Sequence, residues 1–320
     1  MENLIKPRAP FDFAATARFL RYTEVEAVDT FTNGIYRRAI HFGNQLRLLK
    51  VESRGTLSRP LLVVSIDGKS RATRTTTAEM KVAETLVRRM FSVDHDLKKF
   101  RAQVANDPLM SKLEAAHRGL RIARWPQLFE ALVNSILLQQ ISTTGAWTMK
   151  RRFVEKFGEI LKIEGETFYA FPRAETLARV ADADLRAIGL TGAKAVSIIQ
   201  LARRVHEGEL DEDELQREEN ESLIARLIQS RGIGRWTAEW ALMLYFGRTN
   251  VFAAGDLVLR GFVVKYYNDA SPMTESEIRA LAGTRWNEWA SYAAIYLVAG
   301  MRAKTISLRP GSVLLSNSAT

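Results

Sequence analysis

The pattern of hydrophobic and polar positions changes near residue 105 of the chain. Before that point, short segments rich in β-branched and aromatic residues are separated by Asn-Gly, Gly-Asn and Asp-Gly pairs; they span 36–43, 45–55 and 61–68. This pattern predicts antiparallel strands joined by tight turns. Two segments, 13–22 and 78–93, have helical spacing instead. We therefore expect residues 1–105 to form an α+β domain around a small antiparallel sheet.

Helical spacing dominates from about Asp107 onward, and turns with Gly or Pro separate the helices. The expected helices span 108–118, 126–138, 143–157, 174–180, 182–188, 192–206, 221–230, 235–246, 256–267, 274–282 and 286–301. Residues 106–320 are thus expected to form a helical region, which makes the chain mostly α-helical.

The composition excludes several classes of protein and of catalytic site. The chain has 320 residues, 47% of them hydrophobic and 26% charged, as in soluble globular proteins. No stretch reaches the ~18 apolar residues of a membrane span, and the N-terminus has no signal-peptide pattern. Because the chain has no cysteine, disulfides, iron–sulfur clusters, cysteine-bound zinc and thiol nucleophiles are excluded. Its four histidines have no metal-ligand spacing, so a catalytic transition metal is not expected.

The net charge is +10. An acidic stretch at 207–221 lowers this value, so the rest of the chain is more basic than the total indicates. A surface this basic suggests a polyanionic partner, nucleic acid first and anionic membrane second. Charge alone does not decide between DNA binding and no nucleic-acid binding. We expect the acidic stretch to be a solvated connection with a short helical piece.

The most specific short signal lies within 222–246, where Gly232 and Gly234 flank Ile233 between two helices. Two glycines permit a tight turn and a close approach of the backbone to another surface. Amides at the start of the second helix then form an anion site that suits DNA phosphate, with Arg231 and Arg235 beside it. The alternative is a plain corner between two helices.

The segment from Gly232 through the loop 247–256 resembles the helix-hairpin-helix and Gly/Pro-Asp motif of the DNA glycosylase superfamily. In that family a catalytic Asp follows the hairpin by about twenty residues, and here this is Asp256. Segments 129–142 and 185–202 resemble core helices of the family, and the N-terminal region resembles that of bacterial 3-methyladenine DNA glycosylase II. The resemblance implies two helical lobes beside the N-terminal domain.

Two departures from the family pattern favour a monofunctional enzyme for alkylated bases such as 3-methyladenine and 7-methylguanine. Trp236 stands where members that also cut the strand carry a lysine, so no amine nucleophile is expected there. The four-cysteine cluster of other members is absent. Two alternatives stay open: a non-catalytic DNA-structure-binding protein and a glycosylase for oxidised purines.

Asp256 directly precedes an apolar helical run, so local sequence favours a helix N-cap. Asp256 can be both the helix cap and the catalytic carboxylate. The helix dipole and local amides keep a capping Asp ionised, and the reaction needs a negatively charged carboxylate. As the glycosidic bond breaks, positive charge builds on the sugar, and a fixed carboxylate stabilises it or orients the attacking water.

The resemblance implies an aromatic base pocket formed by Trp236, Trp240, Trp289 and Tyr292, with Leu257 where the relatives have an aromatic residue. Electron-rich rings attract a cationic alkylated purine. The alternative is that these side chains belong to the core.

The family also inserts a side chain into the space that the flipped base leaves. The matching position is Gln140, with Ile141 adjacent, although a polar helix-end residue explains Gln140 equally well.

The resemblance further implies a structural Na⁺ or K⁺ at the hairpin when DNA is bound, held by the backbone carbonyls of Ile228, Ser230 and Ile233, and no catalytic cofactor. The expected partner is double-stranded DNA with damaged bases, with no membrane contact. We expect a monomer in the cytoplasm of a prokaryote, associated with the nucleoid.

Overall fold

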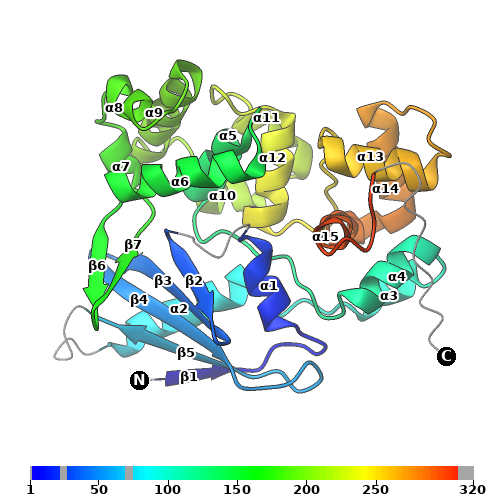
Figure 1. Ribbon diagram of the computed structural model, residues 1–320, viewed down its shortest axis with the longest axis horizontal. Helices are drawn as coiled ribbons and strands as arrows, with labels where there is room; N and C mark the ends of the chain where they lie inside the picture. Colours follow the sequence, from blue (N-terminus) through cyan, green and yellow to red (C-terminus); the bar gives the residue numbers. More distant parts are fainter. Residues whose placement is uncertain (1, 22–26, 69–74, 309–320) are drawn as a thin grey trace.

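The computed structural model describes residues 2–21, 27–68 and 75–308. In Figure 1, a sheet at the lower left carries two helices, and the larger helical part lies above and to its right. The mostly helical fold with an N-terminal antiparallel sheet is therefore confirmed. The outer ends of the two expected domains, residue 1 and residues 309–320, lie outside the described residues.

The sheet has five antiparallel strands in the order β1-β5-β4-β3-β2. Their bounds are β1 (Glu2–Ile5), β2 (Asp29–Thr32), β3 (Ile35–Phe42), β4 (Gln45–Ser53) and β5 (Leu62–Asp67). Asn33 and Gly34 join β2 to β3 with φ angles of 53° and 76°. Positive φ at both central residues is the requirement of a type I′ hairpin turn, which the Asn-Gly pair in the sequence predicts. The sequence pattern did not indicate β1 or β2.

Helices α1 (Phe13–Phe19) and α2 (Thr77–Met90) belong to this N-terminal part. Asp12 caps α1 by accepting the Ala15 amide, and a capping box opens α2. α2 covers one face of the sheet, where Val87 packs in the same core cluster as Val64.

The opposite face of the sheet is covered by a second hairpin, β6 (Ile160–Ile163) and β7 (Glu166–Tyr169). Leu161 and Phe168 of this hairpin bury against Leu48 of β4. Sequence analysis missed the hairpin because strands of four residues are too short to show a period against the helical background.

The remaining helices form two groups, seen on the upper left and the right of Figure 1. The first lobe contains α5 (Leu128–Leu138), α6 (Thr143–Phe157), α7 (Ala174–Leu177), α8 (Asp182–Ala187), α9 (Gly192–His206), α10 (Glu212–Arg217), α11 (Asn220–Leu227), α12 (Arg235–Ala241) and a π-helical turn (Leu242–Phe246). The second lobe contains α3 (Lys98–Val104), α4 (Pro108–Ala116), α13 (Leu257–Tyr267), α14 (Glu275–Trp286), a 3₁₀ turn (Asn287–Trp289) and α15 (Ala290–Arg302).

Several expected helices begin or end a few residues from the observed bounds, and two of the differences have a clear backbone cause. The helix expected over 235–246 becomes a π-helical turn after Ala241, and Gly247 then ends it in the left-handed conformation. The helix expected from residue 286 begins at Ala290, because Asn287 has a φ of 47° that a continuous helix does not allow. The acidic stretch holds the short helix α10, as expected.

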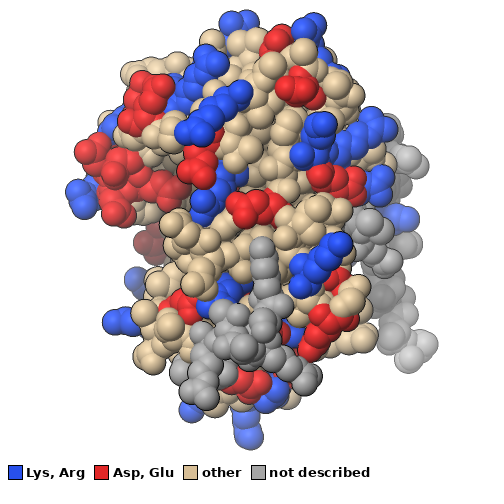
Figure 2. Space-filling model, turned by 90° about the vertical axis from the view of Figure 1, so that its left-hand side faces the viewer, with Lys and Arg blue, Asp and Glu red and all other residues tan. Residues whose placement is uncertain are grey.

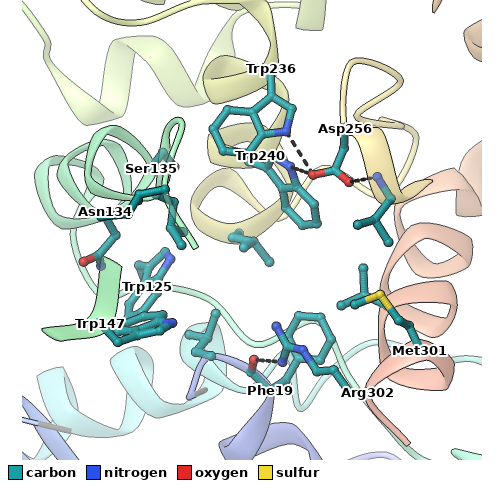
Figure 3. A pocket seen from close by; sticks show the side chains of 16 residues that line it. Phe19, Trp125, Asn134, Ser135, Trp147, Trp236, Trp240, Asp256, Met301 and Arg302 are labelled. Carbon is teal, nitrogen blue, oxygen red and sulfur yellow. Dashed lines mark hydrogen bonds between the residues drawn. The ribbon is translucent and has the colours of Figure 1, made fainter. Parts of the chain in front are cut away.

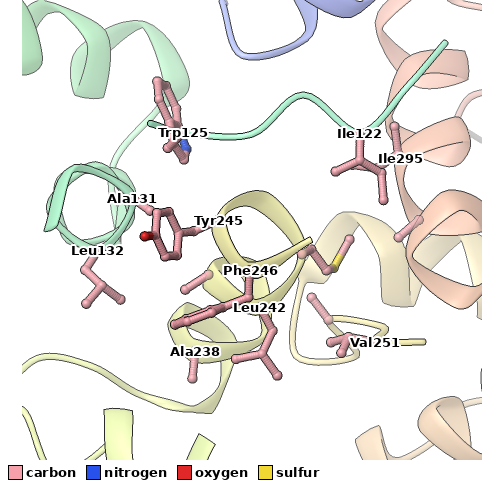
Figure 4. Packing of buried hydrophobic residues seen from close by; sticks show 14 of the residues in the cluster. Ile122, Trp125, Ala131, Leu132, Ala238, Leu242, Tyr245, Phe246, Val251 and Ile295 are labelled. Carbon is pink, nitrogen blue, oxygen red and sulfur yellow. The ribbon is translucent and has the colours of Figure 1, made fainter. Parts of the chain in front are cut away.

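α12 and its π-helical turn pack against α5 to form the core of the first lobe. Figure 4 shows Leu242, Tyr245 and Phe246 beside Ala131 and Leu132 of α5. Because these side chains are buried, α5 and α12 keep a fixed relative position.

A buried ion cluster joins this core to the sheet. Arg38 of β3 is 2% exposed and contacts Asp29 of β2 and Glu130 of α5. Removing one partner of such a pair leaves a buried charge uncompensated, at a cost of about 3–5 kcal/mol. The cluster therefore fixes α5, and the loop that follows it, relative to the N-terminal part.

Candidate active site

Asp256 caps the N-terminus of α13 and is held by four N–H donors. Its Oδ1 accepts the backbone amides of Val258 at 3.0 Å and Leu259 at 3.1 Å. Its Oδ2 accepts the indole Nε1–H of Trp236 at 3.0 Å and of Trp240 at 3.3 Å. Figure 3 shows both indoles meeting the carboxylate. These donors complement a negative charge and fix the orientation of the carboxylate.

The loop that leads to Asp256 is anchored in the core. Val251 and Phe252 are buried, and the Val251 amide donates to Ser291 Oγ at 3.1 Å. Phe252 also stacks on Trp286 of α14, with ring centroids 5.4 Å apart. Asp256 therefore stands on a rigid support, although it follows a loop.

Asp256 borders a cavity of about 230 Å³ between the two lobes, with α1 along one side. Sites for drug-sized ligands are roughly 300–1,000 Å³, so this smaller cavity suits a ligand the size of one nucleobase. Its lining residues are Phe19, Leu20, Trp125, Asn134, Ser135, Leu138, Ile141, Trp147, Trp236, Trp240, Leu244, Asp256, Val258, Val298, Met301 and Arg302.

The tryptophans of α12 lie where the sequence places them. Trp236 and Trp240 are one helical turn apart, and both line the cavity beside Asp256. Their rings are therefore available to a ligand in the cavity as well as to the carboxylate.

Sequence analysis missed a second aromatic wall, formed by Trp125 and Trp147. The ammonium of Lys150 lies 4.7 Å from one ring centroid and 4.3 Å from the other, a cation–π arrangement that holds the two indoles. Phe19 of α1 adds a third aromatic side chain, with the guanidinium of Arg302 over its ring. Nothing in the spacing of these residues distinguishes them from core positions, so only the tertiary structure reveals this wall.

Trp289 and Tyr292 do not line the cavity, which corrects the expected base pocket. Tyr292 is 0% exposed and contacts His95 and Phe100, and Trp289 packs against the same Phe100. The 3₁₀ turn before α15 directs both rings toward α3. Leu257, the first residue of α13, is also outside the pocket wall: it is 80% exposed, although its neighbours Asp256 and Val258 line the cavity.

The hairpin before α12 forms as the sequence predicts. Ile233 is 4% exposed and plugs the core, while Gly232 has a φ of 80°. A Cβ on Gly232 would lie 2.5 Å from the Ser197 hydroxyl, whereas a Cβ on Gly234 would meet nothing within 4 Å. The close approach at Gly232 is therefore to α9, and the space beside Gly234 and the exposed Arg231 is open to another molecule.

Arg235 is paired with two acidic side chains, so its role in DNA binding stays a prediction. Its guanidinium donates to Glu221 at 2.9 Å and to Glu239 at 3.0 Å. Hydrogen bonding to Glu221 raises the pKa of Arg235. Because both acidic partners belong to the first lobe, the side chain ties α12 to α11 rather than extending toward solvent.

The loop after α5 carries Gln140 and Ile141, the residues predicted to act as the wedge, and it is tied at two points. Gln140 is exposed at the tip with a φ of 52°, and Ile141 is 41% exposed and lines the cavity. Lys194 of α9 donates to the carbonyls of Leu137 at 2.9 Å and Gln139 at 2.8 Å. The Gln139 side chain donates in turn to the Gly232 carbonyl of the hairpin at 2.8 Å. The loop and the hairpin therefore form one connected surface.

The carbonyls expected to hold a monovalent cation lie at this hairpin, and the carbonyl of Ser230 accepts the Ile233 amide at 3.0 Å. A carbonyl oxygen has a second lone pair, so this bond leaves the group able to coordinate a cation. Within the described ranges, no cluster of three His, Asp or Glu side chains could hold a metal ion.

Asn134 of α5 lines the cavity, yet its amide has no hydrogen-bond partner. The residue is 2% exposed, and neither Oδ1 nor Nδ2 has a partner. A buried polar atom left unpaired costs about 1–3 kcal/mol, so such atoms are rare unless a ligand or water satisfies them.

On one side of the molecule, charge does not mark a binding face. Figure 2 shows the side of the molecule on which α7, α8 and β6 lie, where basic and acidic side chains are interspersed. Part of the acidic stretch is structural, since Glu212 accepts the amide of Leu128 at the start of α5. Among the described segments, no helix is long and apolar enough to cross a bilayer.

The chain is similar to known proteins over most of its length. Residues 133–288 match the family described as HhH-GPD superfamily base excision DNA repair protein, and residues 4–126 match the AlkA N-terminal domain.

Two curated relatives align with nearly the whole chain. A DNA-3-methyladenine glycosylase of Bacillus subtilis is 31% identical over 287 residues, 90% of this chain and 93% of the relative. DNA-3-methyladenine glycosylase 2 of Escherichia coli is 28% identical over 290 residues, again 90% of this chain and 93% of the relative.

A solved structure, described as a 3-methyladenine DNA-glycosylase from Archaeoglobus fulgidus, superposes with a TM-score of 0.82. It is 24% identical, and the match covers 95% of this chain and 100% of that one. At this level of identity, the likeness concerns the fold.

Proposed function

Because this chain belongs to the HhH-GPD superfamily of base excision DNA repair proteins, we propose that it is a DNA glycosylase for alkylated bases of the 3-methyladenine and 7-methylguanine type. The enzyme takes the damaged nucleotide out of the duplex and hydrolyses the bond between the base and C1′. The observation that carries this function is the carboxylate of Asp256, fixed by two indoles in the wall of a base-sized cavity.

The chemistry follows from the charge that develops on the sugar. As the C1′–N bond breaks, the sugar becomes an oxocarbenium-like cation, and the carboxylate of Asp256 stabilises it without having to reorient. Two hydrogen bonds from the tryptophans and two from the α13 amides keep the carboxylate in place during this step. Water then attacks C1′.

The aromatic walls supply recognition. Trp236 and Trp240 line one side of the cavity, and Trp125 and Trp147 line the other. An alkylated purine with a formal positive charge gains cation–π and stacking contacts there that an undamaged base does not. It is also the better leaving group, so a modest preference in binding suffices.

We propose that the enzyme is monofunctional. Strand cleavage by Schiff-base chemistry needs an amine at C1′, and none of the residues that line the described cavity is a lysine. Lys150 contacts the rings of Trp125 and Trp147 with its ammonium and does not itself line the cavity.

DNA is proposed to bind across the loop after α5, the hairpin and the start of α13. Gln140 and Ile141 enter the space left by the flipped base, and the exposed Leu257 at the start of α13 faces the duplex. The amides near Gly234, with Arg231, receive a phosphate, and a Na⁺ or K⁺ held by the hairpin carbonyls bridges to it.

The cavity is formed by one chain, so we propose that a monomer is active, in the cytoplasm with bacterial chromosomal DNA. Light scattering of the protein bound to a single-lesion duplex checks the first point, since a monomer gives a one-to-one mass.

The function is tested with duplex DNA that contains one deoxyinosine or one 7-methylguanine. We expect strand breaks only after hot alkali, because base release leaves an alkali-labile site. Asp256→Asn should lower the rate at least about 100-fold, since it removes the charge that stabilises the transition state. It should still bind the duplex, since the hairpin and the wedge loop are intact.

Three other results would contradict parts of this proposal. Breaks without alkali mean that the enzyme also cuts the strand. Tight binding without base release means a DNA-structure-binding protein. Preferred release of 8-oxoguanine means a glycosylase for oxidised purines.

A further inference from the structure

The side of the cavity opposite Asp256 carries Asn134. Figure 3 shows Asp256 at one side of the cavity and Asn134 at the other, next to Trp125 and Trp147. A base whose glycosidic bond lies at Asp256 extends its far edge toward this end. For a purine, the far edge is the Watson–Crick edge with N1 and the 6-substituent.

The amide of Asn134 is chemically suited to that edge. A 6-oxo purine offers an acceptor at O6 and a donor at N1–H, and a 6-amino purine offers a donor at N6 and an acceptor at N1. A carboxamide has one donor group and one acceptor, so it pairs with either edge after a half turn about its last bond. Because neither Oδ1 nor Nδ2 has a partner, no contact in the protein fixes one orientation.

We propose that Asn134 is a specificity-determining residue that reads the edge of the flipped base, and that its rotatable amide lets one pocket accept both 6-oxo and 6-amino purines. This inference rests on the proposed function and deepens it. Both amide atoms are shielded from water. The proposal therefore requires the side chain to rotate toward the cavity when a base binds. That rotation breaks no hydrogen bond.

Neighbouring groups do not offer a better partner. Glu130, one turn earlier on α5, also has an unpaired oxygen, but its other oxygen is held by Arg38 at the sheet and the residue does not line the cavity. The hydroxyl of Ser135, which does line it, already donates to the Ala131 carbonyl at 2.9 Å. Among these α5 side chains, Asn134 lines the cavity and has two hydrogen-bonding atoms without a partner.

Methylated duplex DNA tests the proposal in one tube, because it contains both 3-methyladenine, a 6-amino purine, and 7-methylguanine, a 6-oxo purine. Chromatography of the released bases gives their ratio, which does not depend on the fraction of folded enzyme. Asn134→Leu, which removes both hydrogen-bonding atoms, should lower kcat/KM for each base by about tenfold or more.

Asn134→Asp keeps the shape of the side chain but donates only when it is protonated. At high pH its carboxylate can still accept from either base, but it lacks the donor that O6 of 7-methylguanine and N1 of 3-methyladenine need. Release of both bases should therefore fall about tenfold relative to the natural protein at pH 8. The difference should disappear toward acidic pH, as the carboxyl becomes protonated.

Ile136→Val serves as the matched control, because Ile136 is buried on the same helix and does not line the cavity. It should lower the melting temperature slightly and leave both rates unchanged. The proposal is overturned if Asn134→Asp releases both bases at the natural rate at pH 8, or if Asn134→Leu keeps both rates within about twofold. Release of no base by the natural protein would instead overturn the proposed function.

Discussion

At the scale of single residues, the site depends on contacts that serve two purposes. Asp256 is both the cap of α13 and the carboxylate of the proposed reaction, and Trp236 is both its hydrogen-bond donor and part of the pocket wall. A cap residue is fixed by the helix that it opens, so the same backbone amides that require an Asp there also aim it.

Trp236→Phe separates the two purposes of this tryptophan. The ring face remains for stacking, but the 3.0 Å hydrogen bond to Asp256 is lost. A hydrogen bond to a charged group contributes about 1.5–3 kcal/mol, so the single-turnover rate should fall roughly 10- to 100-fold while DNA binding changes little.

Trp289→Phe is the matched control, because the structure places Trp289 against Phe100 and outside the cavity. It should leave the single-turnover rate unchanged. If Trp289→Phe lowers the rate as much as Trp236→Phe does, Trp289 contributes to the base pocket.

At the scale of elements, the loop after α5 is positioned by helices that are distant in sequence. Lys194 of α9 holds the Leu137 and Gln139 carbonyls, and Gln139 reaches the hairpin. Burial lowers the pKa of Lys194, as expected for an amine that has left water to bind carbonyls. The helix end and the wedge loop are therefore held by one side chain.

Lys194→Met should loosen this loop. The carbonyls lose their donor, so Gln140 and Ile141 are less well placed to support a flipped base. We expect about tenfold weaker binding to a duplex with an abasic-site analogue, measured by fluorescence anisotropy. Binding to undamaged duplex should weaken much less.

Lys162→Met removes the same positive charge from the exposed side of β6, away from the cavity. If it weakens abasic-site binding as much as Lys194→Met does, the effect of Lys194 is one of charge and not of loop position.

At the scale of the whole molecule, His95 joins the segment after α2 to α15. Its Nδ1 lies 2.7 Å from the hydroxyl of Tyr292. Burial raises the pKa of Tyr292, so its hydroxyl keeps its proton and donates to a neutral histidine. Burial and then the charges of Arg124 and Arg121 lower the pKa of His95 to about 4 from 6.5.

This shift makes stability depend on pH. Between pH 6.5 and about 4 the unfolded chain binds a proton at this histidine that the folded protein does not, so the free energy of unfolding falls as pH decreases through this range. The loss should be on the order of 2–3 kcal/mol, measured by urea unfolding across the pH range.

His95→Gln should flatten this part of the pH profile, because its side-chain carbonyl still accepts from Tyr292 but does not titrate. His206→Gln, at an exposed position, should retain the full dependence. A profile that is unchanged in His95→Gln would assign the effect to other groups.

The sequence by itself determined the features that depend on neighbouring residues in the chain. These include the Asn33–Gly34 turn, the extent of α9, the glycine hairpin around Ile233, and Asp256 as a helix cap that follows this hairpin. Each is set by the backbone freedom of glycine, by helical spacing or by a local hydrogen bond, all of which act within a few residues.

Only the tertiary structure decided which side chains face the cavity. Helical spacing puts Trp147 and Trp289 on apolar faces alike, but the packing of the two lobes turns one toward Asp256 and the other toward Phe100. The tertiary structure also pairs Arg235 with acidic side chains and leaves the Asn134 amide without a hydrogen-bond partner. These outcomes depend on contacts between segments far apart in the chain, and a local pattern contains no information on which surfaces will meet.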